Sequence, residues 1–146
     1  MSDNDDILNS IRSSFQSALD IVEIKRDIEN EITNIIGLIR KSTDDIVYAE
    51  IESPEVFKNA HFFYNRLLDY DKIITLNSMN NNESDYFLCA YSLNKSTGFP
   101  VVIRYKSEEF SCNTTGILKQ VLKDILTSPE TAMAMANLFN GKEAYY

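Results

Sequence analysis

The sequence has few of the residues on which catalysis and phosphate binding usually depend. Its 146 residues include one histidine, two cysteines and four glycines. The glycines are far apart, so no glycine-rich loop is present to hold a phosphate group. His61, the single histidine, forms no local nucleophile motif with Cys89 or Cys112. We therefore expect a protein that is not an enzyme and that binds no cofactor.

Metal-binding patterns are also missing from the sequence. Cys89 and Cys112 lie in apolar or strand-like segments and lack the close spacing of a zinc or redox motif, so we interpret them as reduced core thiols. The acidic segments at residues 3–6 and 69–71 lack the glycine and the terminal glutamate of a calcium loop. We expect no metal site.

The beginning of the chain does not resemble a targeting signal. Residues 1–6 are acidic where a signal peptide would be basic. No apolar run approaches the roughly 18 to 20 residues of a membrane span. These features predict a cytoplasmic protein without a membrane segment.

Basic residues are fewer than acidic ones, 14 against 22, and the resulting net charge of -8 is unevenly distributed. Residues 1–52 hold 12 of the 22 acidic side chains and 5 of the 14 basic ones, whereas residues 53–146 hold 10 and 9. The N-terminal third would repel phosphate backbones, which argues against nucleic-acid binding. The same charge favours a basic protein partner.

A long helix is predicted at the N-terminus. Residues 5–41 contain no proline and one glycine, Gly37, while Ile and Leu recur at helical spacing. They form two apolar faces that lie roughly a third of a turn apart. The first face contains Ile7, Ile11, Phe15, Ala18 and Val22, and the second contains Ile21, Ile24, Ile28, Ile32, Ile35 and Ile39. The shift near residues 20–24 indicates either a kink or a helix that packs on two surfaces, and it does not fit a regular heptad coiled coil.

The same helix carries four carboxylates at spacings of three, four and four residues. These are Asp20, Glu23, Asp27 and Glu31. The spacing places them on one helical face, where like charges repel modestly. This face is either a docking surface for a basic protein or a solvated surface.

The rest of the chain predicts a small α+β domain. Pro54 follows Ser53 as a helix start, and Ser128 and Pro129 repeat that signal. We expect a strand at 46–52, a helix at 54–69, an antiparallel meander at 72–79, 85–93 and 99–106, a further edge strand at 110–112, and two helices that end near residues 126 and 140. The chain therefore divides into a helical arm, residues 1–42, and a domain, residues 43–146, that we expect to fold without the arm.

Aromatic residues are concentrated on the predicted meander. Successive residues of a strand face opposite sides, so Tyr86, Phe87 and Tyr91 cannot all point inward from a sheet that is covered on one face. Either helices cover both faces or some tyrosines are exposed to a partner. Tyr86 and Tyr91 are the candidate contact residues.

Two functional hypotheses follow from these features. The first is a non-enzymatic binding protein that neutralises or sequesters a protein partner, as immunity proteins and phage-encoded inhibitors do. The alternative is a self-assembling structural or regulatory subunit whose N-terminal helix drives oligomerisation. A helix of roughly 35 residues with so many apolar side chains exposes more apolar area than a small domain can cover, so we expect a homo-oligomer.

Overall fold

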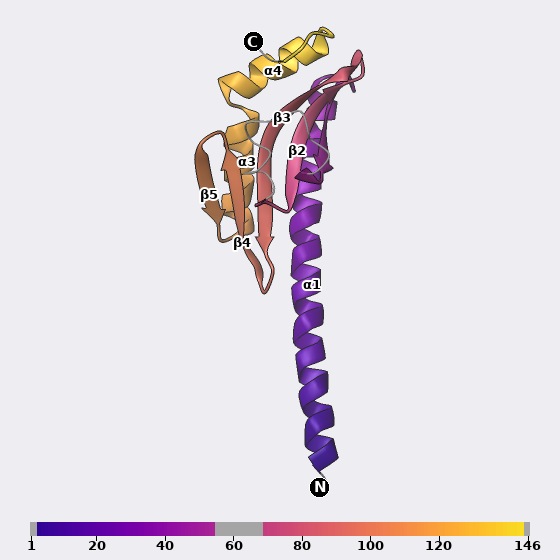
Figure 1. The fold of residues 1–146 in the computed structure, drawn as a ribbon, viewed down its shortest axis with the longest axis vertical. Coiled ribbons are helices and arrows are strands. Elements are labelled where there is room, and N and C mark those ends of the chain that lie inside the picture. Colours follow the sequence, from indigo (N-terminus) through magenta and orange to yellow (C-terminus); the bar gives the residue numbers. More distant parts are fainter. Residues whose placement is uncertain (1–2, 55–68, 145–146) are drawn as a thin grey trace.

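The chain has an α+β fold in which a long N-terminal helix leads into an antiparallel sheet and two short helices (Figure 1). The computed structural model describes residues 3–54 and 69–144. In chain order the described elements are α1 (Asp3–Ser42), β1 (Val47–Glu52), β2 (Lys72–Ser78), β3 (Asn81–Asn94), β4 (Gly98–Tyr105), β5 (Glu108–Cys112), α3 (Thr115–Leu126) and α4 (Pro129–Phe139). The predicted α+β class is confirmed for the long N-terminal helix, the antiparallel meander and the two C-terminal helices. The helix predicted at 54–69 falls almost entirely on residues 55–68, which lie outside the described residues.

The sheet is a five-stranded meander in which every neighbouring pair of strands is antiparallel. It extends the three-stranded meander predicted from the sequence by one strand on each side. Val47 of β1 pairs with Ser78 of β2, and Val101 of β4 pairs with Cys112 of β5. The short strand that the alternation of residues 46–52 predicted is therefore one edge of the sheet, and the segment around residue 110 is the other.

Both C-terminal helices begin where their capping residues predicted. Thr114 Oγ1 accepts a hydrogen bond from the Ile117 N–H at 3.2 Å at the start of α3. Ser128 Oγ accepts one from the Thr131 N–H at 3.3 Å, and Pro129 is the first residue of α4. A hydroxyl at this position satisfies a backbone donor that has no partner within the helix.

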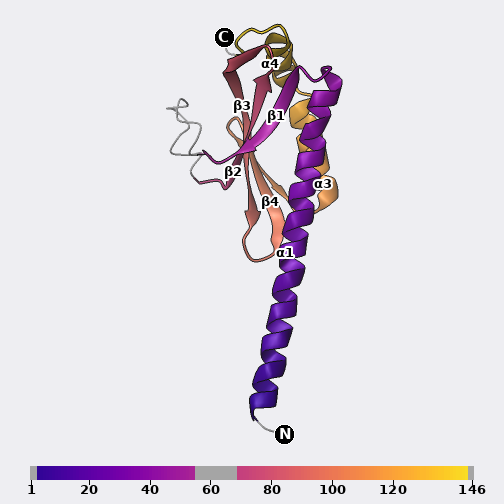
Figure 2. The same ribbon diagram turned by 90° about the vertical axis from the view of Figure 1, so that its right-hand side faces the viewer.

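Helix α1 runs without interruption over its 40 residues, so the shift of its apolar face is not a kink. Ile28, Ile32, Ile36 and Ile39 are buried in the core of the sheet domain. Figure 2 shows the second half of α1 lying with α3 and α4 against one face of the sheet, while the first half extends beyond it. The apolar face shifts where the helix leaves the domain.

This packing places the second half of α1 within the domain. The four buried isoleucines belong to the same core cluster as Leu76, Tyr91 and Leu122. The first buried residue of α1 is Ile28, well before the expected division at residue 42, and Ile24, which is 39% exposed, lies at the boundary beside Gly98 of β4. We call residues 3–24 the free arm.

The opposite face of the sheet carries a smaller apolar cluster. Ile73, Ala90 and Tyr70 are buried there, and Phe87 and Val102 pack against them. All three helices of the described part of the chain lie on the other face.

Candidate interaction surface

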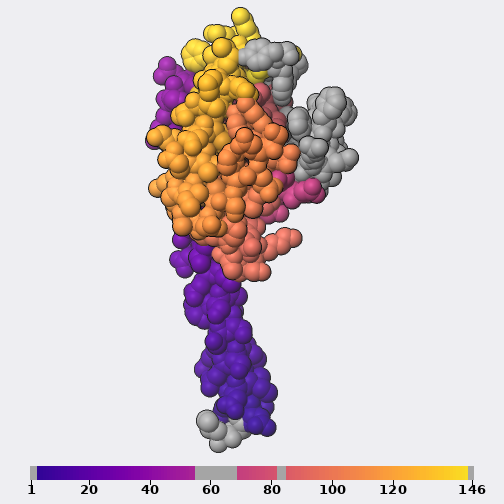
Figure 3. Space-filling view, turned by 90° about the vertical axis from the view of Figure 1, so that its left-hand side faces the viewer, coloured from indigo at the N-terminus to yellow at the C-terminus, as the bar shows by residue number. Residues whose placement is uncertain are grey.

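The free arm exposes a continuous row of large apolar side chains. Figure 3 shows it standing clear of the domain. The exposed fraction is 60% for Ile11, 62% for Phe15 and 61% for Val22, and Ile7, Leu8 and Leu19 are also exposed. At 100° per residue these side chains and Ala18 lie within a sector of about 120°. We call this set of seven residues the apolar face.

Within the apolar face the spacing is regular enough for helix pairing. Leu8, Ile11, Phe15, Ala18 and Val22 are separated alternately by three and four residues, which is the spacing of the seam of a coiled coil. The face predicted from the sequence contains four of the six exposed residues and Ala18, and it lacks Leu8 and Leu19. Both lie in the same sector of the helix, so their positions around the helix axis at 100° per residue would have identified them.

The predicted acidic face lies on a different side of the helix. Its centre is about 140° from the centre of the apolar face at 100° per residue. Asp20, Glu23 and Asp27 are exposed, and Asp20 accepts a hydrogen bond from Gln16 at 3.1 Å. Glu31 lies 3.1 Å from Lys119 Nζ of α3 and is less exposed than the other three. The structure therefore leaves three of the four carboxylates on the surface and ties the fourth to the domain.

The two candidate tyrosines both lie on the helix-covered side of the sheet. Tyr91 is 1% exposed, and its hydroxyl donates to Glu29 Oε2 of α1 at 2.7 Å. Tyr86 is half-buried and packs against the same core. They share a face although their numbers differ in parity, because the register shifts between Ile74 and Thr75 and so reverses the alternation of β3. A protein partner would not reach Tyr91.

A hollow with several cations lies where the free arm meets the domain. It has a volume of about 370 Å³ and includes Lys25, Arg26, Lys72 and Lys95 together with the carboxylates of Glu29 and Asp71. Lys25 Nζ donates to the Lys95 carbonyl at 2.5 Å, which joins α1 to the β3–β4 turn. We call this the root hollow. The sequence analysis missed it because its cations come from the helix, from β2 and from a turn far along the chain.

Comparison with known protein families, characterised proteins and solved structures gives no match. In the described part of the chain, no helix combines the length and the apolarity that crossing a membrane would need.

Both cysteines lie in the core of the domain. Cys89 and Cys112 are free and buried. Burial raises the pKa of the Cys89 thiol to about 12, since the core disfavours the thiolate. His61 lies outside the described residues. Among the described residues there is no group of three or more His, Cys, Asp or Glu side chains that could hold a metal ion.

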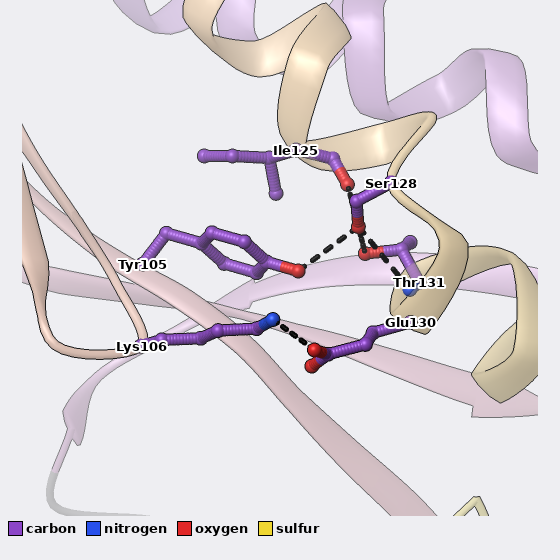
Figure 4. A network of polar contacts seen from close by, with 6 residues as sticks. All are labelled: Tyr105, Lys106, Ile125, Ser128, Glu130 and Thr131. Atoms are coloured by element: carbon purple, nitrogen blue, oxygen red, sulfur yellow. Dashed lines mark hydrogen bonds and ion pairs between the residues drawn. The ribbon is translucent and has the colours of Figure 1, made fainter.

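A polar network connects the start of α4 to the β4–β5 turn (Figure 4). Ser128 Oγ lies 2.9 Å from the Ile125 carbonyl and 2.9 Å from the Tyr105 hydroxyl. If the serine proton goes to that carbonyl, Tyr105 is the donor in the second bond. Lys106 forms an ion pair with Glu130 beside it. This network uses its polar groups internally, and we assign it a structural role.

Proposed function

We propose that this chain is a non-enzymatic protein that acts by association with other protein chains, and that the free arm is its assembly element. The observation that carries the proposal is the exposed apolar face on a helix that extends away from the domain. An apolar helix face is typical of a helix that packs on another surface. The domain covers a different side of α1, so the apolar face of the free arm is left for another chain.

The six large side chains of the apolar face are each between 43% and 62% exposed and lie side by side, and a contiguous apolar patch of this kind is typical of an interaction site. Leaving it in water is unfavourable at roughly 25 cal/mol per Å². Covering it by another helix is the simplest way to remove that cost, and this favours the self-assembling alternative over a partner-neutralising protein.

Sedimentation velocity of the full chain tests the proposal. We expect a dimer or larger assembly between about 1 and about 100 µM, the range for an interface close to the lower size limit. The variant Ile11→Lys with Phe15→Lys should be monomeric, because it places charges in the apolar face. Asn9→Lys with Ser13→Lys adds the same charge at the same spacing on the opposite side of the helix and should still associate. A wild-type chain that stays monomeric throughout would refute the proposal.

The exposed part of the acidic face supports a second candidate, which is the binding and neutralisation of a basic protein. Asp20, Glu23 and Asp27 are exposed in a row away from the apolar face, where they would speed the approach of a positively charged partner. A pull-down with the wild-type chain and with the Asp20→Lys, Asp27→Lys variant tests this. Loss of a captured basic protein in the variant supports the candidate, and equal capture by both chains counts against it.

A further inference from the structure

We infer that the chain that covers the apolar face is a second copy of this protein, and that the two free arms pair in antiparallel orientation. In this arrangement the tip of each arm lies in the root hollow of the other copy. The inference rests on the proposed function, because it requires the free arm to be an assembly element. It adds the identity of the occupant, the direction of pairing and the register.

Side-chain size favours the antiparallel direction. Phe15 is the largest residue of the seam, and Ala18, the next residue of the seam, is the smallest. A parallel pair stacks each residue of the seam on its own copy, which would crowd two phenylalanines in one layer and leave a gap between two alanines in the next. An antiparallel pair can place Phe15 of each copy opposite Ala18 of the other, so large and small side chains alternate.

That register extends well to the remaining layers. Pairing Phe15 with Ala18 also pairs Ile11 with Val22, and it brings Leu8 level with Lys25 at the edge of the root hollow. The free arm has 22 residues from Asp3 to Ile24, or about 33 Å at 1.5 Å per residue. Its full length is therefore used, and the tip of each arm reaches the level at which the other copy joins its domain.

Charge at the two ends of the arm gives an independent reason for the same direction. The first turn carries Asp3, Asp5 and Asp6. The root hollow carries four cations and two carboxylates, and Arg26 also forms an exposed ion pair with Glu23 at 3.7 Å, so the net charge of the group with Glu23 is +1. Antiparallel pairing places the acidic tip beside this hollow twice in the dimer, with Asp5 close to Arg26. Parallel pairing would place the six tip carboxylates together and is opposed by their repulsion.

The root hollow also lies in line with the apolar face. At 100° per residue, Lys25, Arg26 and Glu29 fall in the same sector of α1 as the apolar face. A second helix that follows this sector therefore passes from the apolar contacts to the cations, and it meets the domain at Lys25 and Glu29, which bond to Lys95 and Tyr91. Pairing of two apolar faces would cover exposed side chains on both copies at once, as an interface between identical chains requires.

Disulfide trapping distinguishes the two directions in the full chain. Cys89 and Cys112 are buried and remain as an unreactive background. Oxidation of a mixture of Asp5→Cys chains and Arg26→Cys chains should give a cross-linked heterodimer. Neither variant oxidised alone should cross-link, since in an antiparallel pair each new thiol faces the native residue of the other copy.

A charge exchange at the same contact provides a second measurement. Asp5→Arg alone should raise the dimer dissociation constant about fivefold, because two exposed ion pairs become repulsive contacts. Adding Arg26→Asp to the same chain should restore the constant to within about twofold, which a nonspecific effect of charge would not do.

The outcomes separate this inference from the proposed function. Cross-linking of the mixture with rescue by the charge exchange supports the antiparallel pair. A dimer in which Asp5→Cys chains cross-link to one another is parallel, and it overturns the inference while the arm remains the assembly element. An assembly without the cross-link between residues 5 and 26 has another register and also overturns it. A monomer at every concentration overturns both.

Discussion

Replacing Ile32 by alanine should destabilise the domain strongly, because this side chain of α1 is 1% exposed and lies in the core. Loss of a buried isoleucine in this way costs about 2 to 5 kcal/mol through lost transfer free energy and the cavity that remains. Leu38 is six residues further along the same helix and is 55% exposed. Leu38→Ala should change stability by about 0.5 kcal/mol or less, as is usual for surface sites.

Urea denaturation followed by tyrosine fluorescence measures this difference at equal chain concentrations. The free arm contains no tyrosine, so the signal reports on the domain. With a urea dependence of about 1 to 3 kcal/mol per M, we expect the Ile32→Ala midpoint to fall by about 1 to 2 M and that of Leu38→Ala to stay near the wild-type value.

Truncation of α1 also tests whether its second half is part of the domain core. A chain that begins at residue 24 should retain a cooperative transition, whereas removal of residues 1–41 takes four buried isoleucines from the core and should leave a molten domain. Equal midpoints for Ile32→Ala and Leu38→Ala, or a cooperative transition without residues 1–41, would show that α1 is not part of the domain.

Four further predictions concern single positions. Gly98→Ala should cost about 1 to 3 kcal/mol in thermal unfolding, since Gly98 has φ 82° and a Cβ there would lie 3.0 Å from Ile24 of α1. Gly37→Ala in open space on α1 should instead stabilise the chain by about 0.5 to 1 kcal/mol. Ser128→Ala should cost about 1 to 2 kcal/mol, because it removes the cap of α4. Burial and the bond to a carboxylate raise the pKa of Tyr91 above its ordinary value of 10.0, so its contribution to stability is complete below that pH and is lost as pH rises past it. Tyr91→Phe should make the alkaline loss of stability, measured by urea denaturation at successive pH values, less steep.

Elements with local signals were predictable from the sequence. Thr114 and Ser128 start their helices as expected, because capping depends on a hydroxyl and the next few backbone N–H groups. The widening of the meander to five strands depends on pairings such as Val47 with Ser78, which are distant in sequence. Local propensity does not encode such pairings, so the neighbours of the two edge strands were not specified.

The candidate tyrosines show a limit of a different kind. Strict alternation assigns Tyr86 and Tyr91 to opposite faces of the sheet, and one of them would then be exposed. The register shift opposite Ile74 places both on the helix-covered face, together with Leu88 and Cys89. A bulge depends on the fit between two strands, and the sequence of β3 alone carries no clear sign of it.

Helical spacing alone did not predict how α1 packs. The shift near residues 20–24 fits a kink or two packing surfaces equally well, because both change which side of the helix is buried. After Val22 the same sector of the helix continues into Lys25, Arg26 and Glu29, which are charged. In the structure Lys25 donates to the Lys95 carbonyl and Glu29 accepts from Tyr91, so polar bonds join this sector to the domain while the isoleucines from Ile28 onward enter the core. The apolar face ends at these charged residues at the domain boundary, and it is the part of α1 that we propose a second chain covers.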